Sequence, residues 1–269
     1  MRPPRLSSSI LLVFALTGCR WGCGDLRHDE RVDASDEQST PPDELATLPD
    51  PQPIPDASNP ILLSDRFDLG PGLFSRCNAP DNVNSTWEWG APSSSLDISS
   101  CAGGGGRCWG TRMTGDYSPC EKSCVRSTSL NLAAFTGTIH ITLQVNYQFE
   151  RSGSGESYDG ATVAFRGVTG DWVFVDPTDG SYASRINLGE SESVHCRNAY
   201  EYPTWPGWVQ PPGTAGPSGW QTKEFIIKHA DHPELFHEQF FFALFILSDP
   251  LVCGNGIYVD NVDVRLSDN

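Results

Sequence analysis

The segment Thr138–Glu150 places the strongest constraint on what this chain can fold into. Its apolar and polar side chains alternate without interruption, and the apolar set is Ile139, Ile141, Leu143, Val145, Tyr147 and Phe149. Because successive side chains of a strand point to opposite faces, a period of two predicts an antiparallel strand with one buried face. The segment therefore predicts a sheet that packs one face on a core.

Further segments share this β-branched and aromatic composition. They are Ala161–Arg166, Trp172–Val175, Trp220–Lys228, Gln239–Leu247 and Gly256–Leu266, with turn sequences such as Thr178–Gly180 between them. Roughly 200 residues of short strands predict one β-sandwich with long loops, spanning 61–269. In the last segment the parity of the apolar residues changes between Val259 and Val262. This change predicts a β-bulge near Asp260–Asn261 that turns acidic side chains toward one edge of the sheet.

The N-terminal residues indicate export. Residues 1–18 combine a short basic head with an apolar run at 6–16 that is too short to span a bilayer permanently. The run ends at Leu16–Cys19, which resembles the lipobox of bacterial lipoproteins and implies a lipid on Cys19. The alternative is an ordinary secretory peptide with a chance cysteine. Either way we expect the chain to leave the cytoplasm, and with the lipid we expect it in the cell envelope, at the outer membrane or cell surface.

The segment 19–60 is acidic and rich in proline, and the whole chain has a formal net charge of −16. Low apolar content and like charge cannot offset the entropy lost on folding, so a disordered tether is expected here. Strong negative charge also disfavours nucleic acid and anionic lipid head groups as partners. Membrane attachment is therefore expected through the lipid alone.

The nine cysteines indicate a disulfide framework, because disulfides are the expected state outside the cytoplasm. With Cys19 assigned to lipid and Cys23 in the tether, the domain contains Cys77, Cys101, Cys108, Cys120, Cys124, Cys196 and Cys253. This odd number means that one of them is free, pairs with Cys23 or bonds another molecule. We expect a Cys196–Cys253 pair and internal cross-links within 101–124.

Several short motifs occur in one order along the domain. They are Trp87–Pro92, Cys108–Thr111, Gly115–Tyr117, Glu156–Val163, Gly170–Trp172, Ser218–Trp220, Phe245–Asp249 and Gly256–Val262. Together, over about 62–266, they resemble the jelly-roll modules of the MAM type, in particular those of secreted bacterial metallopeptidases of the immune inhibitor A kind. The resemblance implies an all-β, two-sheet antiparallel jelly roll that is non-catalytic, contacts a glycan or an extracellular protein partner and often contains a structural calcium ion. The chain departs from the pattern at Asn261, where a second Asp is common.

Aspartates of the first and last strands are candidate calcium ligands, because hard cations bind several carboxylate oxygens. Asp65 and Asp68 lie on the first strand, and Asp260 and Asp263 lie on the last. These strands are commonly neighbours in a jelly roll, so the four carboxylates are expected to meet at one edge. The resemblance adds Asp159 as a fifth ligand. The alternative is that these acids are solvated residues of an acidic protein.

A Pro-rich segment contains the candidate ligand contacts Tyr200, Tyr202, Trp205 and Trp208. Rings held on a stiff loop would form a stacking platform for sugar faces. The alternative is that these rings fold back onto the core. The tryptophans of the MAM-like pattern are interpreted as packing residues, namely Trp87, Trp89, Trp109 and Trp220.

Catalytic motifs are weak in this sequence. His237–Phe241 begins like a zinc-peptidase helix, but Phe241 occupies the second ligand position, and no Gly-x-Ser-x-Gly elbow occurs. The leading hypothesis is a lipid-anchored, non-catalytic surface module that binds a glycan or protein partner. The first alternative is a polysaccharide hydrolase or lyase that uses acids within 190–201, such as Glu190 and Glu192. The second is a structural lipoprotein of the envelope.

Overall fold

The computed structural model describes residues 60–78, 81, 83–150, 158–168, 170–182, 184–187, 196, 204–210 and 216–268. Antiparallel strands dominate it, together with two short 3₁₀ helices, η1 (Ala102–Gly104) and η2 (Pro233–Leu235). The expected signal segment and nearly all of the expected tether, residues 1–59, lie outside this part of the chain. Within the described ranges, no helix has the length and apolar character needed to cross a membrane.

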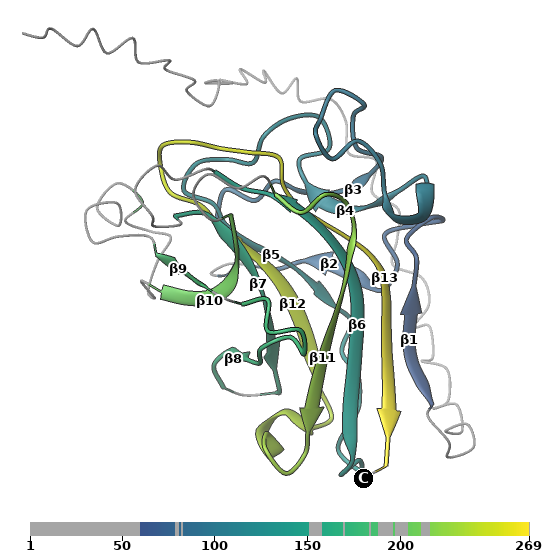
Figure 1. The fold of residues 1–269 in the computed structure, drawn as a ribbon. Helices are drawn as coiled ribbons and strands as arrows, with labels where there is room; N and C mark the ends of the chain where they lie inside the picture. The colour runs from purple at the N-terminus through teal and green to yellow at the C-terminus, as the bar shows by residue number, and fades with distance from the viewer. Residues whose placement is uncertain are drawn as a thin grey trace, which may run out of the picture.

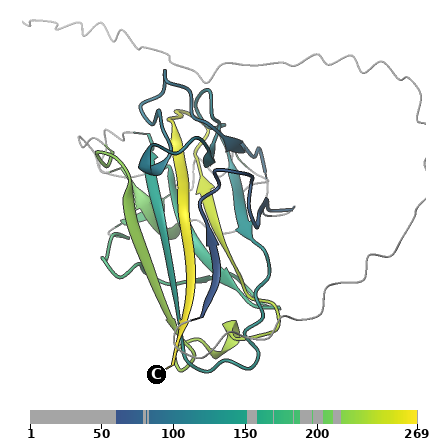
Figure 2. The ribbon, with the colours of Figure 1, turned by 90° about the vertical axis from the view of Figure 1, so that its right-hand side faces the viewer.

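The strands form two facing sheets, which confirms the predicted all-β sandwich. Sheet A has the order β11-β6-β13-β4-β3, and β1 also pairs with β13. Figures 1 and 2 show β11, β6, β13 and β1 running side by side. The strands of sheet A are β1 (Ile61–Asp65), β3 (Trp87–Gly90), β4 (Cys108–Thr111), β6 (Thr138–Gln148), β11 (Gln221–Lys228) and β13 (Gly256–Ser267).

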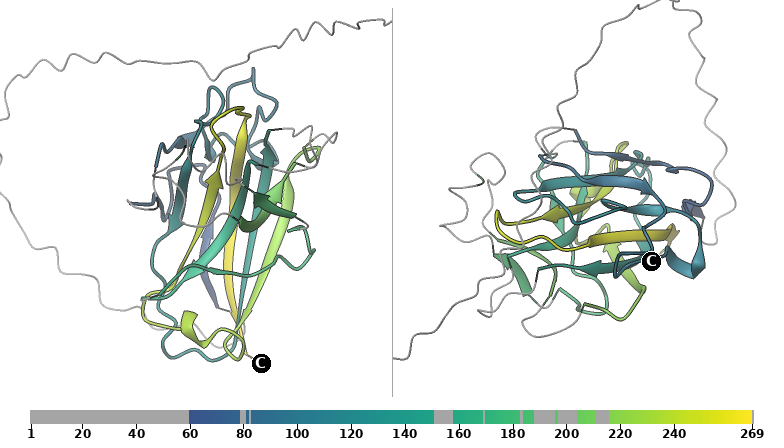
Figure 3. Two further views of the ribbon diagram at one scale, coloured as in Figure 1. Left: turned by 90° about the vertical axis from the view of Figure 1, so that its left-hand side faces the viewer. Right: turned by 90° about the horizontal axis from the view of Figure 1, so that it is seen from above.

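Sheet B has the order β2-β5-β12-β7-β10-β9, and β8 pairs with β7. Its strands are β2 (Phe74–Arg76), β5 (Lys122–Ser127), β7 (Gly160–Arg166), β8 (Val173–Phe174), β9 (Ser184–Asn187), β10 (Thr204–Val209) and β12 (Phe241–Leu247). Figure 3 shows the sandwich from the side and from above. All strand pairs in both sheets are antiparallel.

The core follows from the alternation of the long strand β6. Ile139, Ile141, Leu143 and Val145 are completely buried between the sheets, as the period of two predicts. The even-numbered side chains of β6 therefore lie on the outer face of sheet A. Strand β12 is apolar without interruption because both of its faces are covered. Phe242, Leu244 and Ile246 pack in the core between the sheets, whereas Ala243, Phe245 and Leu247 pack in a second cluster on the outer face of sheet B.

The predicted bulge in the last strand is present. The pairing of β13 with β6 shifts between Asp260 and Asp263, and Asn261 adopts a φ of +48°. The bulge also divides one edge of β13. The residues before it pair with β4, and those after it pair with β1.

Three disulfides correct the expected connectivity. Cys77 pairs with Cys124, Cys101 with Cys108 and Cys120 with Cys196. The expected Cys196–Cys253 pair does not form, because Cys196 is bonded to Cys120. Cys120 lies two residues before the start of β5. Of the expected links within 101–124, only Cys101–Cys108 is internal to that segment. Cys253 is disulfide-bonded as well, so the described part of the chain contains no free thiol.

The Pro-rich aromatic segment is a strand where it is described, rather than the expected loop. Thr204–Val209 forms β10, which pairs with β7 on one side and β9 on the other. Trp208 is completely buried in the core, where its ring lies near those of Tyr147, Tyr182 and Phe225. Trp205 is 5% exposed and packs on the outer face of sheet B against Phe245.

Candidate functional site

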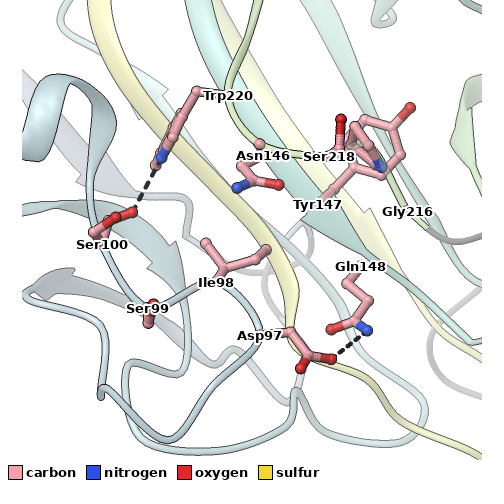
Figure 4. A pocket seen from close by; sticks show the side chains of 12 residues that line it. Asp97, Ile98, Ser99, Ser100, Asn146, Tyr147, Gln148, Gly216, Ser218 and Trp220 are labelled. Carbon is pink, nitrogen blue, oxygen red and sulfur yellow. Dashed lines mark hydrogen bonds between the residues drawn. The ribbon is translucent and has the colours of Figure 1, made fainter.

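A groove of about 590 Å³ lies where β6 ends and β11 begins. Figure 1 shows this end of β6 near β3 and β4, away from the C-terminus. Three segments that are distant in the sequence form the groove. They are Asp97–Ser100 after β3, Asn146–Gln148 at the end of β6 and Gly216–Trp220 before β11. Figure 4 shows their side chains around the groove.

The alternation of β6 determines which of its groups the groove presents. Asn146 and Gln148 share the parity of the outward-facing residues, and the Nε2 of Gln148 donates a hydrogen bond to Oδ2 of Asp97. Tyr147 lies between them and stacks on Trp208, with 6.1 Å between the ring centroids. The rigid core strand thus holds two amide side chains at the floor of the groove.

Trp220 forms the aromatic part of the groove wall. Its indole Nε1 donates a hydrogen bond of 3.0 Å to the carbonyl oxygen of Ser100, as the dashed line in Figure 4 shows. The ring packs against the small cluster around Ile98 and Tyr258 and remains half-buried. The interpretation of Trp220 as a packing residue is therefore incomplete. Its position after the turn Gly216–Gly219 and directly before a strand is the sequence signal that could have indicated an exposed ring.

The chemistry of the groove suits a neutral, hydroxyl-rich ligand. Ser99, Ser100 and Ser218 add hydroxyl groups to the two amides and the indole. Aromatic area beside amide and hydroxyl groups is the combination that holds a sugar ring by its apolar face and its hydroxyls. Among the described lining residues, Asp97 supplies the only carboxylate, whereas glycoside hydrolysis generally uses a pair.

A second hollow of about 380 Å³ lies on the outer face of sheet A. In it, Nε2 of His140 lies 3.0 Å from Oγ of Ser267, and Nδ1 of His140 lies 3.5 Å from Oε1 of Glu224. This arrangement resembles a catalytic triad, with Ser267 as the nucleophile, His140 as the base and Glu224 as the acid that orients the base. However, the three strands that carry them are paired in a continuous ladder. In the described residues, this ladder directs its backbone N–H groups along the sheet rather than into the hollow, so the backbone supplies no oxyanion donor for acyl transfer there.

Glu150, Asp159 and Asp249 form a carboxylate cluster that could hold a metal ion. One oxygen from each lies within 4.8 Å of the others, and the two aspartates are buried. Asp159 accepts hydrogen bonds from the Tyr117 hydroxyl and, at 2.7 Å, from the backbone N–H of Asp249. Burial, and then the charge of Asp249, raise the pKa of Asp159 well above its usual value, and burial raises the pKa of Asp249. Neither aspartate forms an ion pair in the described part of the chain, so a divalent cation would supply the missing positive charge.

The aspartates predicted to share a calcium site lie in two different places. Asp159 directly precedes β7 of sheet B and clusters with Glu150 and Asp249, whereas Asp65, Asp260 and Asp263 belong to strands of sheet A. The prediction that all five ligands meet is therefore wrong, because the sequence motif around Asp159 does not specify which sheet its strand joins. Asp249, which completes the Asp159 cluster with Glu150, was not among the predicted ligands.

The aspartates of the first and last strands already have partners. The carboxylate of Asp65 accepts hydrogen bonds from the N–H groups of Phe67 and Leu73, and that of Asp260 accepts them from Ala102 and Asn261. Burial, followed by the charges of Asp68 and Asp65, raises the pKa of Asp260 to about 6. The carboxylate of Asp263 lies 3.9 Å from the guanidinium of Arg265. Asp65 and Asp68 thus lie near Asp260, although Asp68 follows the end of β1 rather than lying on the first strand as predicted. In the described residues, these aspartates do not form a compact ligand set.

The remaining predicted site residues divide into buried and undescribed ones. The buried positions of Trp205 and Trp208 contradict the stacking platform and support the alternative that these rings pack on the core. Tyr200, Tyr202, Glu190, Glu192 and Cys19 lie outside the described residues.

Comparison with known proteins gives distant structural likenesses. No protein-family model matches the chain, and no curated protein matches it. The CBM22-1 xylan-binding domain of Xyn10C from Paenibacillus barcinonensis is 12% identical over 80% of this chain and 99% of that chain, with a TM-score of 0.34. A cleaved adhesin domain of Lys-gingipain from Porphyromonas gingivalis is 13% identical over 76% of this chain and 98% of that chain, with a TM-score of 0.37.

A third structure, a carbohydrate-binding module for specific mannan recognition, is 10% identical over 78% of this chain and 99% of that chain, with a TM-score of 0.34. All three are distant structural likenesses of the chain. At such identities and TM-scores the likenesses carry no argument about ligand or family, and the MAM-type resemblance stays a prediction.

Proposed function

We propose that this domain is a non-catalytic binding module that holds a glycan in the groove between Asp97–Ser100, Asn146–Gln148 and Gly216–Trp220. The observation that carries the proposal is the half-buried Trp220, fixed by its hydrogen bond to Ser100 and surrounded by amide and hydroxyl groups. A ring held in this way loses little conformational entropy when a sugar stacks on it. The single carboxylate of the described lining favours binding over glycosidic bond cleavage.

Replacing Trp220 by alanine is expected to weaken glycan binding roughly 30-fold, which corresponds to the loss of about 2 kcal/mol for an aromatic residue at the centre of a binding site. The ligand is identified first on an array of neutral plant and bacterial glycans. The dissociation constant of the best binder is then measured for the wild type and the variant by isothermal titration calorimetry. The same glycan should yield no shorter products after prolonged incubation.

Trp89→Ala is the matched control for this experiment. Trp89 is also half-buried, and its Nε1 donates a 2.9 Å hydrogen bond to a backbone carbonyl, that of Phe67, but it does not line the groove. Equal weakening in both variants would indicate a general structural effect and contradict the site. Release of oligosaccharides by the wild type would favour the hydrolase or lyase alternative, whose candidate acids at 190–201 are outside the described residues.

We further propose that Glu150, Asp159 and Asp249 bind a structural calcium ion. Calcium at 100 times its Kd would add about 2.7 kcal/mol to the free energy of unfolding, which corresponds to a rise in Tm of roughly 5–10 °C for a domain of this size. Thermal melts of chelator-treated protein, with and without added calcium, measure this shift.

Two single substitutions assign the ion to one cluster. Asp249→Asn should remove most of the calcium-dependent shift, because it removes a charged ligand, while Asp65→Asn should keep it. The reverse result would place calcium at the first and last strands, and identical melts with calcium and chelator would remove the ion from this proposal. The predicted lipid on Cys19 would hold such a module at the cell envelope.

A further inference from the structure

Two arginines flank one aromatic ring on the outer face of sheet B. Arg126 on β5 is paired across from Ala243, and Arg166 on β7 is paired across from Phe241, so both lie on the face of β12 that Phe241 shares with Phe245. The guanidinium carbons lie 5.5 Å and 5.6 Å from the centre of the Phe241 ring. Arg166 also lies 5.3 Å from the ring centre of Trp172.

Carboxylates compensate these two cations only weakly, although the chain has a net charge of −16. Within the described residues Arg126 forms no ion pair, and Arg166 has only Asp81, at 4.0 Å from one terminal nitrogen. The Nε of Arg166 is buried and has no hydrogen-bond acceptor in the structure. Elsewhere in the domain, the buried Lys223 is neutralised by Asp179 at 2.7 Å. Both arginines are partly exposed, so their guanidinium groups can reach a carboxylate that arrives from solvent.

The geometry points to a carboxylate-bearing ligand. A planar guanidinium binds a planar carboxylate through two parallel hydrogen bonds, and its stacking on an aromatic ring fixes the orientation of those donors. The half-buried indole of Trp172 beside Arg166 offers apolar area for a sugar ring, and the exposed Ser75, paired across from Arg126, offers a hydroxyl group. We propose that Arg126 and Arg166 form a second binding site, which recognises the carboxylate of a uronate residue in an acidic polysaccharide.

This site is separate from the groove. Arg166 ends β7 and Phe241 begins β12, whereas the groove is built around the end of β6 in the other sheet. The proposal therefore goes beyond the neutral-glycan function. Its failure would leave the proposal for the groove standing.

The test is binding of polygalacturonate, alginate and hyaluronan to the whole chain at low salt, with a neutral mannan and poly-L-glutamate as comparison ligands. At least one uronate polymer is expected to bind. Arg126→Gln and Arg166→Gln should each weaken that binding about tenfold or more, because each removes a charge-assisted hydrogen-bond pair. Arg126→Lys keeps the positive charge but lacks the planar pair of N–H donors. It should therefore bind the uronate polymer more tightly than Arg126→Gln and less tightly than the wild type. Thermal melts establish that the variants remain folded.

The matched control is Arg265→Gln, which removes an exposed arginine from sheet A. It should leave uronate binding unchanged, and Trp220→Ala should do so too. Full affinity in both Arg126→Gln and Arg166→Gln, or equal weakening in Arg265→Gln, would overturn the proposal, as would failure of all three uronate polymers to bind. Equal or tighter binding of poly-L-glutamate would assign the site to acidic peptides and overturn the sugar ligand.

Discussion

Replacing Trp208 by alanine is expected to lower the free energy of unfolding by about 3–5 kcal/mol, the range for truncating a large buried aromatic residue. Trp208 has no solvent exposure, and its ring centre lies 5.2 Å from that of Tyr182 and 6.1 Å from that of Tyr147. Its Nε1 also donates a 2.9 Å hydrogen bond to Oγ of Ser181, which would lose its donor. Because small domains have only about 5–15 kcal/mol of stability, this is a large share of the total.

Urea unfolding at equilibrium measures this difference, and Leu69→Ala is the control. Leu69 is fully exposed, so its truncation should change stability by no more than about 0.5 kcal/mol. A loss of less than about 1 kcal/mol for Trp208→Ala, together with weaker glycan binding by folded protein, would contradict the core position. That result would restore the interpretation of the aromatic segment as a stacking platform.

Removing the Cys120–Cys196 disulfide by alanine substitution at both positions is expected to cost about 4.5 kcal/mol, while removing Cys101–Cys108 in the same way should cost about 2.4 kcal/mol. The reason is the entropy of the unfolded chain, because the first bond closes 76 residues and the second only seven. Urea unfolding of the two double variants without reductant compares them directly. An equal cost for both bonds would contradict this account, and so would a greater cost for the short loop.

The local parts of the fold could be predicted from the sequence. The alternation in Thr138–Glu150 predicts β6 and its buried face, and the change of parity after Val259 predicts the bulge, because both depend on neighbouring residues of one strand. The apolar run Gln239–Leu247 predicts a buried strand, which is observed as β12.

The candidate sites could be predicted only in part, because they depend on contacts between distant segments. The groove joins residues near 98, 147 and 218, and no local pattern indicates that these two loops and the end of β6 meet. The spacing of cysteines likewise does not encode their pairing, which follows from where Cys120 and Cys196 lie once the sheets have formed. For Trp205 and Trp208, the prolines favoured a loop, but pairing of the segment between β7 and β9 outweighed that local preference.

The division of one edge of β13 between two short partners has a consequence for local opening. β4 pairs with Tyr258 and Val259, and β1 pairs with Val262–Arg265, so the two strands share no backbone hydrogen bond across the bulge. Detachment of β1 therefore leaves the β4 ladder intact. Amide hydrogen exchange in native protein can then proceed in two independent blocks along this edge, with the five-residue β1 opening at a lower free energy than the interior of the sheet.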